Sequence, residues 1–359
     1  MRWIRLTALS ISAGIAGCIT AEVGLRLFYP QPLYTFERHL FQADPDLGYR
    51  LTPHAVMTHT QPEYSYAIRA NSFGFRGREP NPDAQHRVLV LGDSFGMGFG
   101  VKEGRNLCEV AQAELSARGH DVDIFNTSIT AYFGGNQISV LDRLAEAYAP
   151  ELVVLLFYWN DIGVTESKRI GRGHLRSSGD GSKILWCREI LNRRSHLFCL
   201  VKRFHYATLR HPWGERAARL SLTRRPDVSA TRPDLGSTLC YIAEMEAACH
   251  TVGSEFRVVL LPYRGVLNDP PGQFPVVKQA MIDAMITQNI VYIDWAPLLP
   301  VDGARELSFR FDQHWNEDGH RFFGRHLVDV ITRSLRLSAP GADAPSTEVA
   351  SDLRSPTPH

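Results

Sequence analysis

Ser94 occupies a position from which a serine can act as a nucleophile. It follows the aliphatic residues 88–91 and stands among glycines, a pattern that predicts a short buried strand ending in a tight turn. Open α/β sheets bind their ligands at the carboxyl ends of the strands. A nucleophilic serine also needs a general base, a group that orients the base, and hydrogen-bond donors for a developing oxyanion.

A histidine and an aspartate near the end of the chain are candidates for the base and its orienting group. His314 is the candidate base, because a neutral imidazole can accept a proton near neutral pH. Asp312 would hold the tautomer of the imidazole and stabilise the imidazolium. Asn316, followed by two acidic residues, predicts the start of a helix. The pair therefore lies on the loop after the last predicted strand, at the same sheet edge as Ser94.

Two more loops should reach that edge with oxyanion donors. The loop that begins at Asn126 is rich in small residues, which leave backbone N–H groups accessible. Asn160 follows the third predicted strand, and its side-chain amide could donate to an oxyanion; loss of one such donor typically costs about 10²–10³ in rate. Each motif alone is common. Their order, one after each successive strand, favours a single hydrolytic site.

These motifs resemble the sequence blocks of the SGNH or GDSL hydrolases, over roughly residues 86–336. The matching residues are Gly92-Asp93-Ser94, the segment from Asn126, Trp159-Asn160-Asp161 and Asp312-Gln313-His314. By this resemblance Ser94 is the nucleophile, His314 the base and Asp312 its orienter. The oxyanion hole would combine the backbone N–H of Ser94, a backbone N–H of the second block and the side chain of Asn160.

The chain departs from the family pattern at three points. Ala131 stands where the second block has a glycine, so its N–H would serve the oxyanion from a narrower pocket, and Gly134 is the alternative. Tyr158 and Trp159 precede the third-block asparagine, so bulky aromatic side chains, together with Gly134, would line the substrate cleft. The acid and base are spaced Asp-x-His rather than Asp-x-x-His. None of these changes removes a catalytic group.

Strand-like and helical patterns alternate from residue 87 onward. Strands rich in Val, Leu and Ile between amphipathic helices are typical of a parallel sheet covered on both faces. We therefore predict a three-layer α/β/α domain with a five-stranded parallel sheet, which the resemblance makes flavodoxin-like. The expected strands are 88–91, 122–126, 152–158, 256–262 and 290–294, and the expected helices are 103–119, 136–148, 236–252, 275–288 and 316–335.

The rest of the chain divides by composition. Residues 27–85 lack a sustained helical period and are expected to form an extended segment packed on the hydrolase domain, 86–336. Within it, residues 69–77 predict a turn that packs aromatic side chains on the core; alternatively, Asn71 or Arg76 lines the mouth of the cleft. The tail, 337–359, is rich in Pro, Ser and Ala and is expected to be disordered.

A basic insertion at 163–235 interrupts the alternation. Residues 166–232 hold sixteen Lys or Arg and five acidic residues. We expect a helical lid over the carboxyl edge of the sheet. The basic residues are consistent with a solvated surface, with a face on anionic lipid, or with a site for an acidic polymer.

The amino terminus, 1–26, has the features of a membrane anchor or signal segment. Basic residues precede the apolar run 6–23, which is interrupted only by small or hydroxyl residues and Glu22. About 20 apolar residues span a bilayer, and the basic flank would leave the domain periplasmic or extracellular. The same residues fit a secretory signal, and 15–18 resemble a bacterial lipobox with Cys18 as the lipidated residue. A buried helix is the remaining alternative.

Composition narrows the class of protein. The 359 residues are 44% hydrophobic and 21% charged, as in ordinary globular proteins, and a net charge of +1 gives no indication of a nucleic acid partner. The six cysteines lack metal-ligand spacing, so neither a metal nor a cofactor is expected; first candidates for disulfides are Cys187–Cys199 and Cys240–Cys249. Four histidines are more typical of surface or helix positions than of metal ligands, namely His39, His54, His59 and His320.

The segment around Ser94 also contains sequence patterns similar to those of two other protein families. Residues 92–96 read Gly-x-Ser-x-Gly, the α/β-hydrolase elbow, but that fold usually has several strands before the nucleophile and an acid far from the histidine. The glycines at 96, 98 and 100 lack the spacing of a dinucleotide site.

We expect a serine esterase that works through an acyl-enzyme and hydrolyses or transfers O-acetyl groups of envelope or extracellular carbohydrate. The alternative is a non-catalytic glycan-binding or envelope-assembly protein that uses the same cleft.

Overall fold

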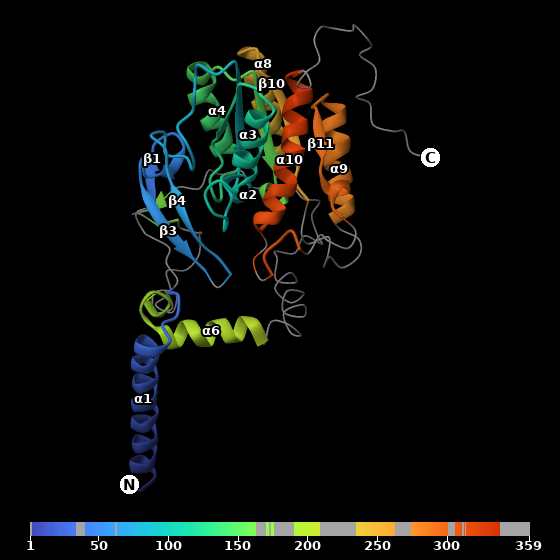
Figure 1. The fold of residues 1–359 in the computed structure, drawn as a ribbon. Coiled ribbons are helices and arrows are strands. Elements are labelled where there is room, and N and C mark those ends of the chain that lie inside the picture. Colours follow the sequence, from blue (N-terminus) through green and yellow to red (C-terminus); the bar gives the residue numbers. More distant parts are fainter. Residues whose placement is uncertain are drawn as a thin grey trace.

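Five parallel strands form the central sheet of the computed structural model (Figure 1). The structure describes residues 2–33, 40–61, 63–162, 170–171, 174–175, 190–208, 235–262, 274–300, 306–310, 312 and 314–337. The strands are β5 (His86–Gly92), β6 (Val122–Asn126), β7 (Leu152–Phe157), β10 (Glu255–Leu260) and β11 (Tyr292–Asp294). Their order is β11-β10-β7-β5-β6, which is the flavodoxin-like 2-1-3-4-5 order when the strands are counted along the chain. The predicted α/β fold with a five-stranded parallel sheet is confirmed.

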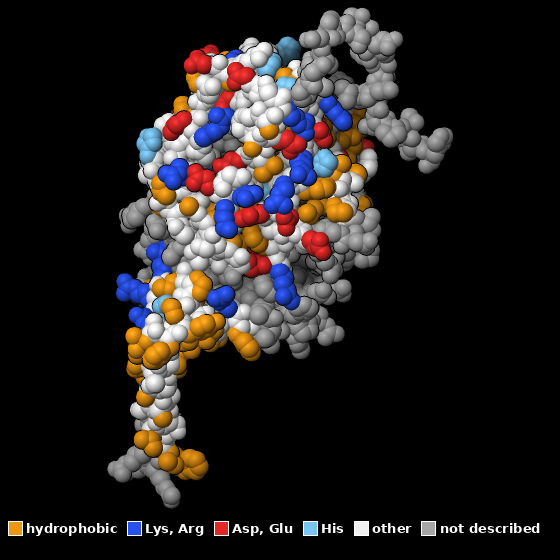
Figure 2. Space-filling model, in the orientation of Figure 1, with side chains coloured by type: hydrophobic (Ala, Val, Ile, Leu, Met, Phe, Trp, Pro, Cys, Tyr) orange, Lys and Arg blue, Asp and Glu red, His pale blue; other side chains and the backbone are white. Residues whose placement is uncertain are grey.

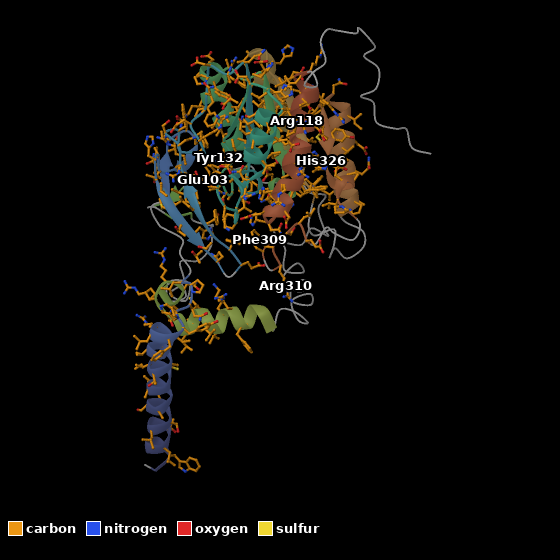
Figure 3. All side chains as sticks on the ribbon, viewed as in Figure 1. Glu103, Arg118, Tyr132, Phe309, Arg310 and His326 are labelled. Carbon is orange, nitrogen blue, oxygen red and sulfur yellow. The ribbon has the colours of Figure 1, made fainter. Side chains whose placement is uncertain are left out.

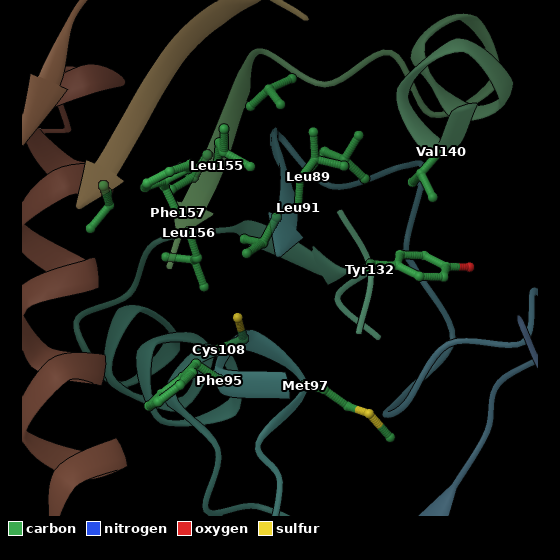
Figure 4. Close-up of a cluster of buried hydrophobic side chains, with 14 of the residues drawn as sticks. Leu89, Leu91, Phe95, Met97, Cys108, Tyr132, Val140, Leu155, Leu156 and Phe157 are labelled. Atoms are coloured by element: carbon green, nitrogen blue, oxygen red, sulfur yellow. The ribbon is translucent and has the colours of Figure 1, made fainter. Parts of the chain in front are cut away.

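Strand β7 at the centre of the sheet is apolar along its whole length, as expected of a strand whose two faces are both covered by helices. Every residue of β7 is buried, and Figure 4 shows Leu155, Leu156 and Phe157 of this strand beside Leu89 and Leu91 of β5. Alternating apolar and polar residues would have indicated one solvated face. This layering is what continuous aliphatic runs in the sequence predict.

The helices lie close to their expected positions. They are α3 (Leu107–Ala117), α4 (Gly134–Tyr148), α8 (Leu235–Thr251), α9 (Phe274–Thr287) and α10 (Glu317–Ser334). The first begins later than expected because Asn106 and Glu109 form a capping box at its start. Helix α3 packs on α10, and α4 packs on α8, as right-handed crossovers on opposite faces of the sheet require.

The amino-terminal extension contains two antiparallel hairpins that the sequence did not indicate. Strand β1 (Phe41–Asp44) pairs with β2 (Gly48–Leu51), and β3 (Val56–Thr60) pairs with β4 (Ser65–Arg69). Each strand has only four or five residues, which is too short for a clear period. The first hairpin joins the parallel-sheet domain through Tyr49, whose hydroxyl donates to the Thr130 carbonyl at 2.7 Å.

The turn at 69–77 places two polar side chains in the interior of the protein and leaves Ser72 and Phe73 exposed. Asn71 and Arg76 are each 3% exposed, and the Asn71 carboxamide oxygen accepts the N–H groups of Phe73 and Phe75. The Arg76 guanidinium donates to the carbonyls of Met97, Gly98 and Val101, which lie just after Ser94. The alternative in which Asn71 or Arg76 lines the mouth of the cleft is therefore wrong, because both side chains are buried and hydrogen bonded to backbone groups.

An apolar helix, α1 (Arg2–Phe28), stands apart from the globular part and meets α6 (His196–Thr208) at its end (Figure 1). The Glu22 carboxylate accepts the N–H groups of His196 and Leu197 and the hydroxyl of Ser195, so it caps the first turn of α6. Figure 2 shows hydrophobic side chains along α1 and on the side of α6 nearest to it.

The basic insertion is described only in part. Besides α6 it includes a short hairpin of β8 (Ile170–Gly171) and β9 (His174–Leu175). The expected lid over the carboxyl edge of the sheet falls mostly outside the described residues, as does the expected disorder of the tail from residue 338 onward. The domain boundaries proposed from composition stay predictions.

The Cys240–Cys249 disulfide candidate is wrong. Both residues belong to α8 and carry free thiols. Nine residues of α-helix separate them by about 13 Å along the axis, whereas a disulfide needs Cα atoms within about 7 Å. Cys187 lies outside the described residues, so the structure does not address the Cys187–Cys199 pair.

Close packing of α10 on α3 depends on Gly324. A Cβ atom there would lie 2.8 Å from Val110 Cβ and 2.9 Å from the Leu107 carbonyl oxygen. We expect Gly324→Ala to lower the free energy of unfolding by about 1–2 kcal/mol, because overpacking outweighs the higher helix propensity of alanine. Denaturant unfolding measures this. The neighbouring exposed change Arg325→Ala should stay within about 0.5 kcal/mol of wild type, and a stabilised Gly324→Ala variant would contradict the packing argument.

Candidate active site

Ser94 lies where the order of the strands reverses. It begins the short helix α2 (Ser94–Met97) directly after β5, and β5 has β6 on one side and β7 on the other. Crevices at such switch points are the usual ligand sites of open α/β sheets. The Ser94 residue is buried, with 7% of its surface exposed.

Ser94, His314 and Asp312 are hydrogen bonded in series. The Nε2 atom of His314 lies 2.8 Å from the Ser94 hydroxyl oxygen, and its Nδ1 atom lies 2.5 Å from an oxygen of Asp312. An ionised carboxylate can only accept, so Nδ1 carries the proton and Nε2 accepts from the serine. This is the arrangement in which an imidazole can remove a proton from a hydroxyl.

The Asp312 carboxylate is held in its ionised form. Burial alone would raise its pKa, but the hydrogen bonds and charge of His314 and the hydroxyl of Tyr64 together lower the pKa of Asp312 to about 2. The hydroxyl of Tyr64 donates to the second carboxylate oxygen at 2.9 Å. The imidazole is packed between the rings of Phe95 and Phe99, with centroid distances of 5.0 and 4.6 Å.

Two of the proposed oxyanion donors, the Ser94 N–H and the Asn160 amide, lie at the start of α2. Ser94 opens that helix, so its N–H has no acceptor within the helix. Asn160 donates from Nδ2 to the buried Asp93 carboxylate at 3.3 Å, and its amide carries a second N–H. Ala131 has a φ of +62°, a left-handed conformation that favours glycine, which matches the glycine of the family pattern at this position.

Asp93 is a site residue for which sequence reasoning predicted no role. It is fully buried, and its carboxylate accepts the N–H of Phe95 at 2.8 Å as well as the Asn160 amide. Burial raises its pKa, while these hydrogen bonds and the charge of His314 act in the opposite direction. Its position inside the Gly-Asp-Ser block was the available signal. Asp93 thus connects the nucleophile turn to the loop after β7.

The three residues predicted to line the substrate cleft are packed against neighbouring elements. Tyr158 is 2% exposed and its ring lies 4.2 Å from that of Phe95. Trp159 donates its indole N–H to the Leu261 carbonyl at 2.8 Å. A Cβ at Gly134 would lie 2.7 Å from the ring of Tyr241, so this glycine permits close contact between α4 and α8. Their part in binding substrate stays a prediction.

The histidines singled out in the sequence differ in environment. His54 is exposed, His320 is buried in α10 and accepts the Leu107 N–H, and His39 is outside the described residues. A surface position for His59 is wrong, because this residue of β3 is only 2% exposed. Its ring nitrogens contact Tyr66 and Gln61, and burial lowers the pKa of His59 to about 4. Within the described ranges, no three His, Cys, Asp or Glu side chains are grouped as metal ligands.

Glu63 and Tyr64 were missed because nothing local marks them. They stand at the tip of the β3–β4 hairpin, and the Glu63 carboxylate accepts the N–H groups of Arg310 and Asp312 at 2.7 and 2.8 Å. Tyr64 reaches Asp312 across 248 positions of sequence. The extension therefore contributes directly to the environment of the acid.

Among curated proteins, the chain is similar to an arylesterase from Vibrio mimicus. The two are 31% identical over 78 residues, which is 22% of this chain and 39% of that one; the chain thus matches less than half the length of this relative. No family model matches the chain.

Several solved structures of esterases and acylhydrolases are also similar to the chain. The esterase EstA from Pseudoalteromonas sp. has 13% identity and a TM-score of 0.42, covering 70% of this chain and 100% of that one. The lipase/acylhydrolase from Enterococcus faecalis has 14% identity and a TM-score of 0.42, covering 72% and 100%. A putative lipolytic protein of the G-D-S-L family from Desulfitobacterium hafniense has 14% identity and a TM-score of 0.40, covering 68% and 99%.

The low pKa of Asp312 predicts an acid-dependent loss of stability. Its folded pKa of about 2 lies below the unfolded value of about 3.9, so its contribution is present above pH ~4 and is lost as the pH falls towards 2. We expect Asp312→Asn to be less stable than wild type by about 2 kcal/mol at pH 7 and to approach wild type near pH 2. Denaturant unfolding across this range measures the difference. A difference that does not change with pH would contradict the assignment.

Proposed function

We propose, from the premise that the chain belongs to the SGNH (GDSL) hydrolase family, that it is a serine ester hydrolase. The grounds for this membership are the parallel-sheet fold, the order of the four sequence blocks and the similarity to an arylesterase. The observation that carries the proposed activity is the hydrogen-bonded series of Asp312, His314 and Ser94.

In the proposed mechanism the Ser94 hydroxyl attacks the carbonyl carbon of an ester while His314 Nε2 takes its proton. Asp312 holds the imidazole and stabilises the imidazolium. The oxyanion of the tetrahedral intermediate receives hydrogen bonds from the backbone N–H groups of Ser94 and Ala131 and from the Asn160 amide.

Collapse of the intermediate breaks the bond to the leaving oxygen, which takes the proton from His314 and departs as an alcohol. An acyl-enzyme on Ser94 remains. Water then attacks with His314 as the base, and a second tetrahedral intermediate releases the carboxylic acid and restores the serine. If a sugar hydroxyl replaces water in this step, the same chemistry transfers the acyl group.

We propose O-acetyl groups on envelope or extracellular carbohydrate as the substrate, on the basis of location. The helix α1 contains a 20-residue stretch, Leu9–Phe28, with a mean hydropathy of 1.4, and the rest of the protein buries none of this apolar stretch. As an anchor it would place the domain at the outer surface of the membrane. Glu22 lies near the end of this stretch and caps α6, which accounts for the one acidic residue of α1.

Labelling with a fluorophosphonate tests the proposed nucleophile. We expect native wild-type protein to be labelled and to hydrolyse p-nitrophenyl acetate, because the probe reacts with activated serines. Ser94→Ala should lose the label and reduce the rate by at least about 10⁴-fold. Ser72→Ala, in an exposed turn where the hydroxyl contacts Glu79, is the control and should behave as wild type.

The same experiment separates the esterase from the non-catalytic alternative. If wild type is not labelled, or if Ser94→Ala is labelled equally, the esterase proposal is wrong and glycan binding by the cleft becomes the better hypothesis. Release of acetate from a panel of acetylated polysaccharides then tests the substrate class.

Fractionation of cells tests the anchor. We expect the full chain to remain in the membrane after carbonate extraction, to retain residues 1–26 by mass spectrometry, and to incorporate no palmitate, because a helix spanning the bilayer needs no lipid on Cys18. Protease added to spheroplasts should digest the globular domain. Palmitate incorporation that Cys18→Ser abolishes would instead establish the lipoprotein alternative, and a chain that begins after a cleavage site would establish a signal sequence.

A further inference from the structure

We propose that the tip of the β3–β4 hairpin is a positioning element of the active site, with Tyr64 orienting Asp312 and Glu63 holding the backbone of its loop. The inference rests on the proposed function, since it concerns the acid that supports His314. It assigns a role in catalysis to the amino-terminal extension, which contains none of the four blocks of the hydrolase pattern.

The two oxygens of Asp312 have separate partners. Oδ1 accepts the backbone N–H of His314 at 3.0 Å and lies 2.5 Å from its Nδ1. Oδ2 accepts the hydroxyl of Tyr64 at 2.9 Å. Because a carboxylate that is held at both oxygens cannot rotate about χ2 without losing a hydrogen bond, Tyr64 fixes the plane in which Oδ1 meets the imidazole.

The Tyr64 hydroxyl is suited to donate a hydrogen bond to the Asp312 carboxylate while it keeps its own proton. Its hydroxyl is a single donor, and burial together with the charge of Asp312 raises its pKa far above the ordinary value. Hydrogen bonds to an ionised acceptor are among the stronger ones in proteins. The tyrosine therefore stabilises the ionised form of Asp312, which is the form that supports an imidazolium at His314.

Glu63 fixes the loop on which Asp312 lies. One of its oxygens accepts the N–H of Arg310 at 2.7 Å and the other accepts the N–H of Asp312 at 2.8 Å. The base of the same loop is closed by a bridge between Ser308 and Trp315. The hairpin tip and this bridge thus hold the loop from opposite ends.

Aromatic packing keeps the hairpin tip against the site. The ring of Tyr64 lies 4.7 Å from that of Phe309 and 5.9 Å from that of Phe99, and Phe99 itself packs on His314. Figure 3 shows Phe309 beside the end of the β3–β4 hairpin. Gly100, with a φ of +89°, allows this approach, because a Cβ there would lie 2.5 Å from the Phe309 ring.

The test compares Tyr64→Phe with Tyr66→Phe. Tyr66 belongs to the same hairpin and is buried, but its hydroxyl contacts His59 and not Asp312, so it controls for loss of a buried hydroxyl. With p-nitrophenyl acetate we expect Tyr64→Phe to lower kcat by about 10- to 100-fold, the range of a hydrogen bond to a charged group. KM should stay within about twofold, since Tyr64 does not touch the substrate, and Tyr66→Phe should stay within about threefold of wild type in kcat.

A spectroscopic readout separates positioning from a purely structural role. The proton between His314 Nδ1 and Asp312 should give a downfield proton NMR signal in wild type that shifts or broadens in Tyr64→Phe and is unchanged in Tyr66→Phe. If Tyr64→Phe does not fold by circular dichroism, Glu63→Gln replaces it: an amide cannot accept two N–H groups through two oxygens, so kcat should fall several-fold.

The outcomes distinguish this inference from the proposed function. A wild-type protein that is neither labelled by fluorophosphonate nor active would overturn the esterase proposal and this inference with it. An active wild type with an unchanged kcat and NMR signal in folded Tyr64→Phe would overturn the positioning role alone. Equal losses in Tyr64→Phe and Tyr66→Phe would do the same, because the hairpin would then act only through its packing.

Discussion

The hydrogen bond between His314 and Ser94 is the contact on which the candidate site depends. It joins residues 220 positions apart, at a distance of 2.8 Å. Such a contact requires the loop after β11 and the turn after β5 to meet at one edge of the sheet, although β11 lies at the far end of the strand order. The parallel arrangement satisfies this requirement, because all carboxyl ends then face the same side.

Part of the support for this hydrogen bond comes from outside the loops that carry the three residues. Arg76 binds the carbonyls that follow α2, and Tyr64 and Glu63 bind the loop that carries Asp312. All of these belong to the amino-terminal extension. The parallel-sheet domain and the extension therefore both contribute side chains to the surroundings of the site, and α1 contains the proposed membrane anchor.

The two carboxyl groups near Ser94, those of Asp312 and Asp93, have pKa values shifted in opposite directions. Asp312 has hydrogen-bond donors at both oxygens and a pKa lowered to about 2, so it remains ionised beside the imidazole. Burial instead raises the pKa of Asp93, whose hydrogen bonds to Phe95 and Asn160 hold the turn and the loop after β7 together. One carboxylate thus supports charge that develops during the proposed reaction, and the other organises the donors around it.

The sequence by itself determined the strands and helices of the parallel-sheet domain and their order along the chain. Aliphatic runs marked β5 and β7, and Asn316 marked the start of α10, because periodicity and capping are local properties. The order of the motifs was sufficient to predict that Ser94 and His314 share one sheet edge. Only the tertiary structure decided that Tyr64 meets Asp312, that Ala131 has a left-handed backbone, and that Tyr158 and Trp159 pack against their neighbours. These features depend on contacts between distant segments, which leave no repeating pattern in the chain.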